Sequence, residues 1–351
     1  MALIGTGFIA EAHVTVLRAL ADVSVVAVVD VAAARAARFA QRHGIARVHA
    51  SVEELLAHGE VDAVHILVPP VLHRELALQC LRAGLHVLVE KPLVLRAEEV
   101  ADLEAAALAS GTVLAVNHNQ ACHPALAHLQ RQLERGRLGR LEHVDLQHNV
   151  PLRQLATGDV GHFMFQTGAN IVWEQGVHLF SVVYALLGDC RSVHASTGEP
   201  RRLPNGVDFR DEWFVALQCE RGTAHVRMAF GRAMLETTVH VLGSDGAAFV
   251  DLQRASCWLR TKTRWLEFLD HGWNLFAGGV RLVGRALGTV LGYGLGLFRL
   301  AFPDDPFLRG MRGSLGAFHA AVRGRAALPA PLTARAAHAV LSKCMETARA
   351  A

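Results

Sequence analysis

A glycine-rich turn stands at the start of the chain, between an apolar run and a helical pattern. Residues 2–4 are typical of a buried strand, Gly5-Thr6-Gly7 follows, and residues 8–20 place apolar side chains at helical spacing. In this context the first glycine permits a tight turn, and the second permits a bound phosphate group to approach the backbone closely. The helix N-terminus offers unpaired N–H groups. The turn therefore predicts a strand–turn–helix unit that opens a parallel sheet.

The first third of the chain continues this alternation of short apolar runs and helices. The predicted strands are residues 2–4, 23–29, 61–68, 86–89 and 113–116. Ser51 and Glu54 form a capping box, and Gly84 and Gly111 mark two helix ends. These units predict a doubly wound α/β domain. Only Met1, Ala2, Leu3 and Ile4 precede Gly5, so the first strand is short, which a start codon annotated too late would explain.

The pattern changes after about residue 120. A helix is predicted from Pro124 to Glu134, and longer alternating runs follow it. The predicted strands are residues 141–149, 212–230, 236–251 and 256–263, with Gly222 and residues 243–246 at turns. We expect a dinucleotide-binding Rossmann domain over residues 1–121 and an α+β domain with a mostly antiparallel sheet over residues 122–351.

The bulk composition excludes several classes of protein. The net charge is +3 and the arginines are scattered along the chain, whereas a nucleic-acid-binding protein typically has a clustered basic face. Six cysteines without a Cys-x-x-Cys pair predict reduced thiols. The N-terminus lacks the pattern of a signal peptide, so a cytoplasmic location is expected.

Asp30 strengthens the interpretation of the glycine turn. It follows the second predicted strand, where a carboxylate accepts hydrogen bonds from an adenosine ribose and repels a 2′-phosphate. Gly5, Thr6, Gly7, Phe8, Ile9 and Asp30 are therefore predicted to bind a dinucleotide. NAD is favoured, although Arg35 in the next helix leaves NADP open. The alternative is a turn that only connects a strand to a helix.

Two further motifs make the sequence similar to a known family. Val68-Pro69-Pro70-Val71-Leu72-His73 and Glu90-Lys91-Pro92 resemble the Gfo/Idh/MocA oxidoreductases. The resemblance implies an NAD(P)-dependent enzyme that acts on a secondary alcohol or ketone of a sugar, nucleotide sugar or cyclitol. It also implies that Lys91 lies between nicotinamide and substrate, that Pro69, His73 and Glu90 belong to the cofactor site, and that the Lys91–Pro92 peptide is often cis.

The residues themselves support a chemical role for Lys91. It follows a predicted parallel strand, at the edge where open α/β sheets bind ligands. The chain has only three lysines, Lys91, Lys262 and Lys343, and otherwise uses arginine as its strong cation. Arginine stays charged, whereas lysine can exchange a proton. The alternative is a surface lysine at a strand end.

The resemblance extends to a second motif, Glu174-Gln175-Gly176-Val177-His178. It implies that His178 exchanges a proton with the reacting hydroxyl and that Glu174 orients either a substrate hydroxyl or His178. On a helix these two residues project from the same face. Asn119 aligns with a segment that touches nicotinamide or substrate in the family. His118 and His123 lack a third ligand, so no metal is predicted.

Two other functions fit the same fold. One is cleavage of a glycoside with tightly bound NAD, which oxidises the substrate transiently. The other is a non-catalytic regulator that senses a dinucleotide, which the presence of Lys91 and His178 disfavours. A homo-oligomer formed through the C-terminal sheet is also expected.

Residues 273–302 form an atypical segment rich in Leu, Val, Phe and Gly. On a helix, small residues and arginines would form one stripe against a broad apolar remainder. Thirteen residues without formal charge separate Arg285 from Arg299, too few to span a bilayer. We expect a buried helix pair or a subunit contact, with peripheral membrane contact as the alternative.

Overall fold

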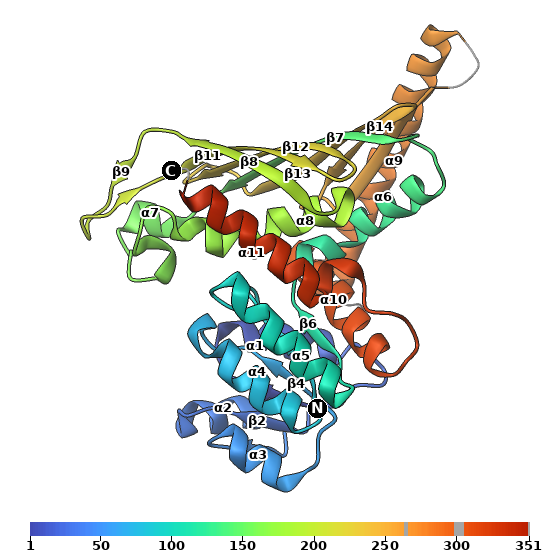
Figure 1. The fold of residues 1–351 in the computed structure, drawn as a ribbon. Helices are drawn as coiled ribbons and strands as arrows, with labels where there is room; N and C mark the ends of the chain where they lie inside the picture. Colours follow the sequence, from blue (N-terminus) through green and yellow to red (C-terminus); the bar gives the residue numbers. More distant parts are fainter. Residues whose placement is uncertain (263–265, 298–304, 350–351) are drawn as a thin grey trace. The chain divides into compact units, whose positions relative to one another are not determined.

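The computed structural model of the chain describes residues 1–262, 266–297 and 305–349. These residues form two compact units, which Figure 1 colours along the chain. The first unit contains residues 1–119 and 310–341, and the second contains the described residues of 120–309 and 342–351. The sequence placed residues 310–341 in the second domain, whereas their contacts group them with the first unit.

The first unit is built on a six-stranded sheet in which all neighbouring strands are parallel. The strands are β1 (Ala2–Ile4), β2 (Ala27–Val29), β3 (Arg47–His49), β4 (Ala63–Ile66), β5 (His86–Val89) and β6 (Leu114–Val116), in the spatial order β3-β2-β1-β4-β5-β6. Strands β1, β4 and β5 have almost no exposed surface, which explains their continuous apolar sequences. The predicted Rossmann topology is confirmed.

Helices surround this sheet. They are α1 (Phe8–Leu17), α2 (Ala33–His43), α3 (Val52–His58), α4 (His73–Arg82) and α5 (Val100–Ser110). Two helices near the C-terminus, α10 (Pro306–Val322) and α11 (Ala334–Arg349), are each divided between the two units. Short 3-10 turns lie at η1 (Pro70–Leu72), η2 (Ala97–Glu99), η3 (Asn119–Cys122) and η6 (Ala330–Leu332). The predicted cap is confirmed, because the Ser51 side chain accepts a hydrogen bond from the Glu54 N–H. Strand β3 was missed, because it is a short edge strand with mostly exposed side chains.

The second unit is built on a seven-stranded sheet. Its strands are β7 (Leu141–Val150), β8 (Cys190–Thr197), β11 (Glu212–Cys219), β12 (Gly222–Phe230), β13 (Glu236–Gly243), β14 (Gly246–Asp251) and β15 (Ser256–Thr261), in the order β15-β14-β13-β7-β12-β11-β8. The predicted hairpin turns before residue 222 and at residues 243–246 are confirmed. Among the described pairs of this sheet, only β7 with β12 is parallel. Residue 263, the predicted end of the last strand, lies outside the described residues.

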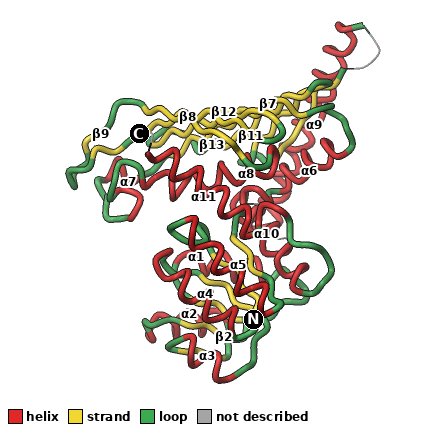
Figure 2. Tube along the Cα trace, viewed as in Figure 1, coloured by secondary structure: helices red, strands yellow, loops and turns green. Residues whose placement is uncertain are grey.

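Helices of the second unit pack against one face of this sheet. They are α6 (Pro124–Glu134), α8 (Val177–Leu187) and α9 (Glu267–Leu297), and α7 (Arg153–Thr157) and η4 (Phe163–Phe165) lie in the connection after β7. A π-helical turn, η5 (Val172–Gly176), leads directly into α8, and a two-stranded ribbon joins β9 (Arg201–Arg202) to β10 (Asp208–Phe209). Helix α8 contacts β7 and β12, and α6 contacts β14 and β15. Figure 2 shows the strands in yellow with these helices in red.

One prediction about the cysteines is wrong. Cys190 on β8 and Cys219 on β11 form a disulfide. The two residues are partners in the antiparallel register of these strands, beside an irregularity between Gln218 and Cys219. Sequence spacing did not reveal this pairing, because strand register brings the two residues together across a long sequence separation. Cys80, Cys122 and Cys344 are free thiols.

Helix α9 is a second departure from expectation. Its apolar side chains are exposed, including Trp273 at 64%, Leu275 at 80% and Val290 at 72%. The expected burial as part of a helix pair within the domain is therefore wrong for the described residues. Residues 298–302 of the predicted segment lie outside the described residues.

Helix α9 also differs in length and composition from the other helices. Among the described residues, Phe268–Gly292 is the one helical stretch long and apolar enough to cross a membrane by these two criteria. The sequence places Asp270, Arg281 and Arg285 within it. Charged residues near the middle of a span are costly, so this stretch fits the interface of a bilayer better than its core.

Candidate active site

The glycine turn has the geometry expected of a phosphate-binding turn. Gly5 has φ +99°, and a Cβ there would lie 2.9 Å from the Leu67 carbonyl oxygen. Its N–H donates to the Val29 carbonyl over 2.8 Å, which fixes the turn to the neighbouring strand. Gly7 precedes α1, provides no side-chain cap and has open space beside it. The first N–H groups of α1 are thus positioned to receive an anion.

Asp30 is held rigidly at the end of β2. Its Oδ2 accepts from the Thr6 N–H at 2.9 Å and from Thr6 Oγ1 at 2.6 Å, and its Oδ1 accepts from the Ala32 N–H at 2.9 Å. Arg35 donates to both carboxylate oxygens. Burial raises the pKa of Asp30, but the hydrogen bonds from Arg35, Thr6 and Ala32 together outweigh burial and lower the pKa to about 2. Asp30 is therefore a fixed negative charge beside the glycine turn.

Apolar side chains are exposed along the same edge of the sheet. Phe8 is 92% exposed after β1, Val31 is 91% exposed after β2, and Val71 is 72% exposed after β4. Exposed apolar side chains clustered at one edge are typical of a ligand-binding surface. Phe8 was predicted to bind the dinucleotide, whereas Val31 was not, and Val71 was noted only as part of the motif that resembles the family.

The Glu90-Lys91-Pro92 turn follows β5 at this edge, and the Lys91–Pro92 peptide is cis, as the resemblance implies. The Glu90 side chain points into the unit, where Oε1 accepts from His13 Nε2 at 2.8 Å and from Asn117 Nδ2 at 2.6 Å. Its Oε2 accepts from the Lys91 N–H at 3.2 Å. Burial raises the pKa of Glu90, but His13, Asn117 and Lys91 lower it overall. Glu90 is therefore a buried carboxylate that holds the Lys91 backbone.

The buried network continues on both sides of Glu90. His13 Nδ1 lies 2.9 Å from His65 Nδ1. On the other side, Ser314 Oγ donates to Asn117 Oδ1 over 2.6 Å, so helix α10 is joined to the end of β6. Each of these side chains is almost fully buried. The sequence analysis missed this network, because its members come from five separate elements.

His73 and Pro69 occupy different surroundings. Pro69 is exposed at the start of η1. His73 has no exposed surface, and its Nδ1 and Nε2 lie 2.8 Å from the Pro92 and Val68 carbonyl oxygens. Burial lowers the pKa of His73, and these carbonyl groups oppose that effect. His73 thus joins the loops after β4 and β5, and any contribution to cofactor binding comes through the shape of those loops.

Asn119 is the last residue of the segment 1–119 of the first unit. It is 3% exposed, and its Oδ1 has no hydrogen-bond partner among the described residues. Gly310 packs against its backbone, where a Cβ would lie 2.8 Å from the Asn119 carbonyl oxygen. A buried acceptor without a partner is rare, which fits a group that binds a ligand.

Glu174 and His178 lie in the second unit and are half-buried. Glu174 belongs to the π-helical turn η5, and His178 belongs to the first turn of α8. The predicted regular α-helix is therefore wrong at Glu174. Gly176 explains the tight packing here, because a Cβ would lie 3.0 Å from Val172 Cγ1 and 3.3 Å from Phe180 Cε2. Such π turns are frequent at functional sites.

A buried histidine anchors this turn to the sheet. His148 lies on β7. Its Nε2 is 3.3 Å from Gln175 Oε1, and its Nδ1 is 2.9 Å from Thr237 Oγ1. Burial lowers the pKa of His148 to about 4, so the ring is neutral at physiological pH. His148 therefore holds Gln175 in place, between Glu174 and Gly176. The sequence did not predict this role of His148.

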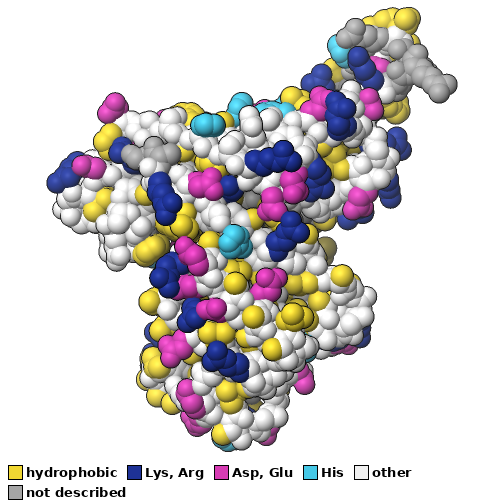
Figure 3. Space-filling model, in the orientation of Figure 1, with side chains coloured by type: hydrophobic (Ala, Val, Ile, Leu, Met, Phe, Trp, Pro, Cys, Tyr) yellow, Lys and Arg dark blue, Asp and Glu magenta, His cyan; other side chains and the backbone are white. Residues whose placement is uncertain are grey.

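The residues of the first unit fit an NAD cofactor. The open helix N-terminus suits a pyrophosphate, the fixed Asp30 carboxylate suits ribose hydroxyls, and Asn119 Oδ1 suits an amide donor. On the face shown in Figure 3, Lys and Arg side chains are interspersed with Asp and Glu, with no continuous basic surface there.

Comparison with known proteins agrees with this geometry. Residues 1–118 match the family described as "Oxidoreductase family, NAD-binding Rossmann fold", and residues 126–249 match the "GFO/IDH/MocA C-terminal domain". The chain is 30% identical over 269 residues to trans-1,2-dihydrobenzene-1,2-diol dehydrogenase of Oryctolagus cuniculus, covering 74% of this chain and 76% of the relative. The chain belongs to the Gfo/Idh/MocA oxidoreductase family.

Other Gfo/Idh/MocA relatives match over shorter stretches. The 1,5-anhydro-D-fructose reductase of Ensifer adhaerens is 40% identical, over 33% of this chain and 35% of the relative. This chain spans only 35%, 53% and 62% of the length of three curated relatives that it matches. An oxidoreductase from Agrobacterium radiobacter, solved with NAD⁺, L-tartaric acid and magnesium, has a TM-score of 0.76 at 15% identity, covering 99% of this chain and 95% of that one. That likeness concerns the fold.

Proposed function

We propose that this chain transfers a hydride between NAD and a secondary alcohol or ketone of a sugar, nucleotide sugar or cyclitol. The observation that carries the proposal is the position of Lys91. It follows β5, two strands from β1 and the glycine turn, at the same edge of the parallel sheet. Two strand spacings are about 10 Å, so a dinucleotide bound at the glycine turn reaches Lys91 by extending along this edge.

The proposed roles follow from the chemistry of each side chain. Bound nicotinamide supplies the hydride acceptor and donor. Lys91 or His178 takes the proton of the reacting hydroxyl, and the other stabilises the charge that develops on the substrate oxygen. Glu174 orients either a substrate hydroxyl or His178. The buried Glu90 carboxylate keeps the Lys91 backbone in position by accepting a hydrogen bond from the Lys91 N–H.

Replacement of Lys91 by methionine tests the proposal. The full-length protein is assayed with NAD and a panel of cyclitols, hexoses and nucleotide sugars, and NADH is followed by its absorbance. For Lys91→Met we expect near-normal NAD binding and a fall in turnover of about a hundredfold or more. Lys343→Met is the matched control, because Lys343 forms an ion pair with Glu346 on its own helix.

The outcome distinguishes the candidate functions. Near-normal turnover by Lys91→Met contradicts the proposed role of this residue. Binding of NAD without turnover on the whole panel contradicts the oxidoreductase proposal and favours a regulator. Substrate cleavage without net NADH formation favours the glycoside-cleaving alternative.

The preference for NAD over NADP is also part of the proposal. Asp30 is ionised and faces the ribose position, which opposes a 2′-phosphate. Arg35 already pairs with Asp30, and its side chain is 53% exposed. We expect Asp30→Ser to release Arg35 and to raise kcat/KM for NADP relative to NAD. An unchanged ratio contradicts this assignment.

We further propose that the helix-free face of the seven-stranded sheet joins two copies of the chain. Phe214 and Leu242 are exposed on this face, at 43% and 37%. An antiparallel sheet with one face in water is stable, so an open face does not by itself indicate an interface. The proposal is supported by the apolar character of these two side chains and by the family resemblance. Light scattering measures the mass: a dimer that Phe214→Glu dissociates supports the proposal, and a monomeric parent protein contradicts it. Leu108→Glu, exposed on α5 in the other unit, is the control.

For α9 we propose contact with a membrane surface. Its exposed apolar residues are Phe268, Leu269, Trp273, Leu275, Phe276, Val280, Leu282, Val283, Leu287, Val290, Leu291 and Leu295. At 100° per residue most of them fall on about half of the helix circumference, the pattern of a helix that lies in an interface. On the other side, Asn274 is bonded to the backbone N–H and carbonyl of Thr261. Among the described residues, Asn274 thus attaches the helix to β15 from the side opposite most of these apolar residues.

Vesicle flotation tests this contact. We expect the full-length protein to float with vesicles that contain anionic phosphatidylglycerol. Leu287→Glu combined with Val290→Glu should abolish flotation, while the Leu108→Glu control retains it. A parent protein that stays at the bottom of the gradient contradicts membrane contact and leaves a protein partner as the occupant of this face.

A further inference from the structure

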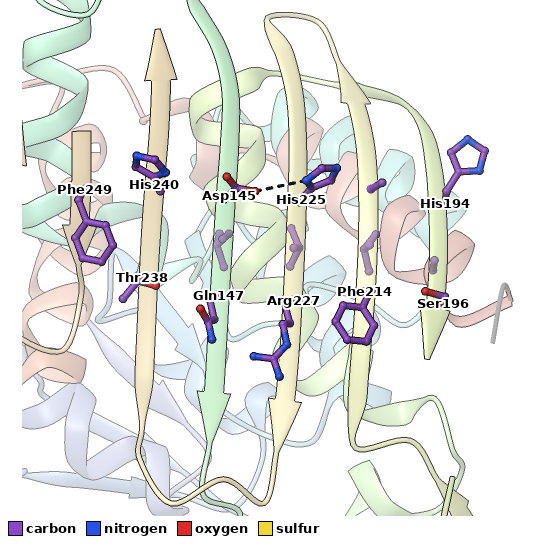
Figure 4. A pocket seen from close by; sticks show the side chains of 15 residues that line it. Asp145, Gln147, His194, Ser196, Phe214, His225, Arg227, Thr238, His240 and Phe249 are labelled. Carbon is purple, nitrogen blue, oxygen red and sulfur yellow. Dashed lines mark ion pairs between the residues drawn. The ribbon is translucent and has the colours of Figure 1, made fainter. Parts of the chain in front are cut away.

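Three potential metal ligands meet on the helix-free face of the second sheet. His143 and Asp145 alternate with buried residues along β7, and His225 lies beside Asp145 in the register of β12. One ligand atom from each residue lies within 4.8 Å of the other two. Figure 4 shows Asp145 and His225 pointing toward each other from neighbouring strands, with His240 on the next strand beyond Asp145. No metal was predicted from sequence, because the residues are brought together only by strand pairing.

The distances match those between ligands of one metal ion. His143 Nε2 lies 3.1 Å and His225 Nδ1 lies 3.5 Å from Asp145 Oδ1. Zinc ligands stand about 2.0–2.2 Å from the ion, so neighbouring ligand atoms are separated by roughly 3.0–3.5 Å for angles between octahedral and tetrahedral. The two distances to Asp145 therefore match those between ligands of one ion, and the His143 and His225 ligand atoms lie within 4.8 Å of each other. In the single chain, the exposed fractions of the three side chains, 20%, 49% and 66%, leave an entry path from solvent.

A second partner orients one of the ligands. His143 Nδ1 lies 2.6 Å from Thr223 Oγ1, which leaves Nε2 directed toward Asp145. Metal-binding histidines typically use their other ring nitrogen in this way, which fixes the ring and its tautomer. An ordinary ion pair with a protonated His143 is the competing explanation for the Asp145 contact.

The charge around the three residues favours a cation. Arg227 is the nearest cation on β12 of this face, and it forms an ion pair with Glu212. The forms of these side chains that bind a metal are the neutral imidazole and the carboxylate, which together carry one negative charge. Two imidazoles and one carboxylate suit borderline divalent transition metals better than Mg²⁺ or Ca²⁺.

We propose that His143, Asp145 and His225 bind one divalent transition-metal ion, such as Zn²⁺, with solvent completing the coordination. The ion displaces any proton that His143 and Asp145 share, so binding strengthens as the pH rises. It also links β7 to β12, the parallel pair of the sheet, whose ladder is slightly weaker per residue than an antiparallel one.

Direct binding of Zn²⁺ to the untagged full-length protein tests the proposal. Calorimetry at pH 7.5 should give one site per chain that weakens at pH 5.5, and Zn²⁺ should raise the Tm. His225→Ala should weaken binding at least tenfold and remove the Tm increase. Thr223→Val keeps all three ligands, and loss of the hydrogen bond between Thr223 and His143 should weaken binding about tenfold.

His194→Ala is the matched control, because His194 lies on the same face but on the edge strand β8. It should bind Zn²⁺ like the parent protein. Equal binding by His225→Ala and His194→Ala would place the ion elsewhere and overturn the proposal. So would the absence of binding at submillimolar Zn²⁺. These readouts do not depend on the redox activity.

Discussion

Replacement of Asp30 by asparagine should destabilise the first unit by a calculable amount. The pKa of this carboxyl falls from 3.8 to about 2 in the folded chain. Since one pKa unit corresponds to about 1.4 kcal/mol, the ionised form contributes roughly 2–3 kcal/mol to the free energy of unfolding at neutral pH. The side chain is only 2% exposed, so solvent screens these contacts weakly. Asparagine would lose the charge and turn an amide group toward N–H donors.

The dependence on pH has a definite sign. A carboxyl whose pKa is lowered by folding stabilises the native state fully above its unfolded pKa, and the contribution is lost as the pH falls through the folded value. The difference between the parent protein and Asp30→Asn should thus be constant from pH 7 to pH 5. It should shrink between pH 3.8 and about pH 2, the two pKa values of Asp30.

Urea unfolding followed by circular dichroism measures this difference. Asp102→Asn is the control, because Asp102 forms an exposed ion pair with Arg74, and such pairs contribute about 1 kcal/mol or less. The reasoning would be refuted if Asp30→Asn were no more destabilising than Asp102→Asn at pH 7. A difference that grew on acidification would refute it as well.

Three other substitutions test the remaining structural arguments. His13→Ala leaves the buried Glu90 carboxylate without one of its partners and should cost about 3–5 kcal/mol in unfolding free energy, measured in urea; a cost below 1 kcal/mol contradicts the network. Gly176→Ala should lower the Tm and kcat together, because the added Cβ crowds the π turn, and unchanged values of both would contradict that packing. Cys190→Ser should lower the Tm of the oxidised protein but leave the Tm unchanged when a reductant is present, whereas equal effects in both conditions would show that Cys190 and Cys219 are not bonded in solution.

Local patterns in the sequence predicted a large part of the fold. The strand, Gly5-Thr6-Gly7 and the helix after it are consecutive, so their backbone geometry depends on neighbouring residues alone. The same holds for the Ser51 cap, and for the hairpin that turns at residues 243–246. Edge strands such as β3 were missed, because their side chains are neither continuously apolar nor strictly alternating.

The sequence alone therefore determined the parallel sheet, the glycine turn with Asp30, and the Glu90-Lys91-Pro92 turn as the candidate site. The tertiary structure decided how distant residues meet: Glu90 with His13, Cys190 with Cys219, and His143 with Asp145 and His225. It also assigned His73 to the support of two loops rather than to the surface of the site. The physical reason is that strand register, burial and the packing of separate elements depend on the whole fold, whereas turns and caps depend on adjacent residues.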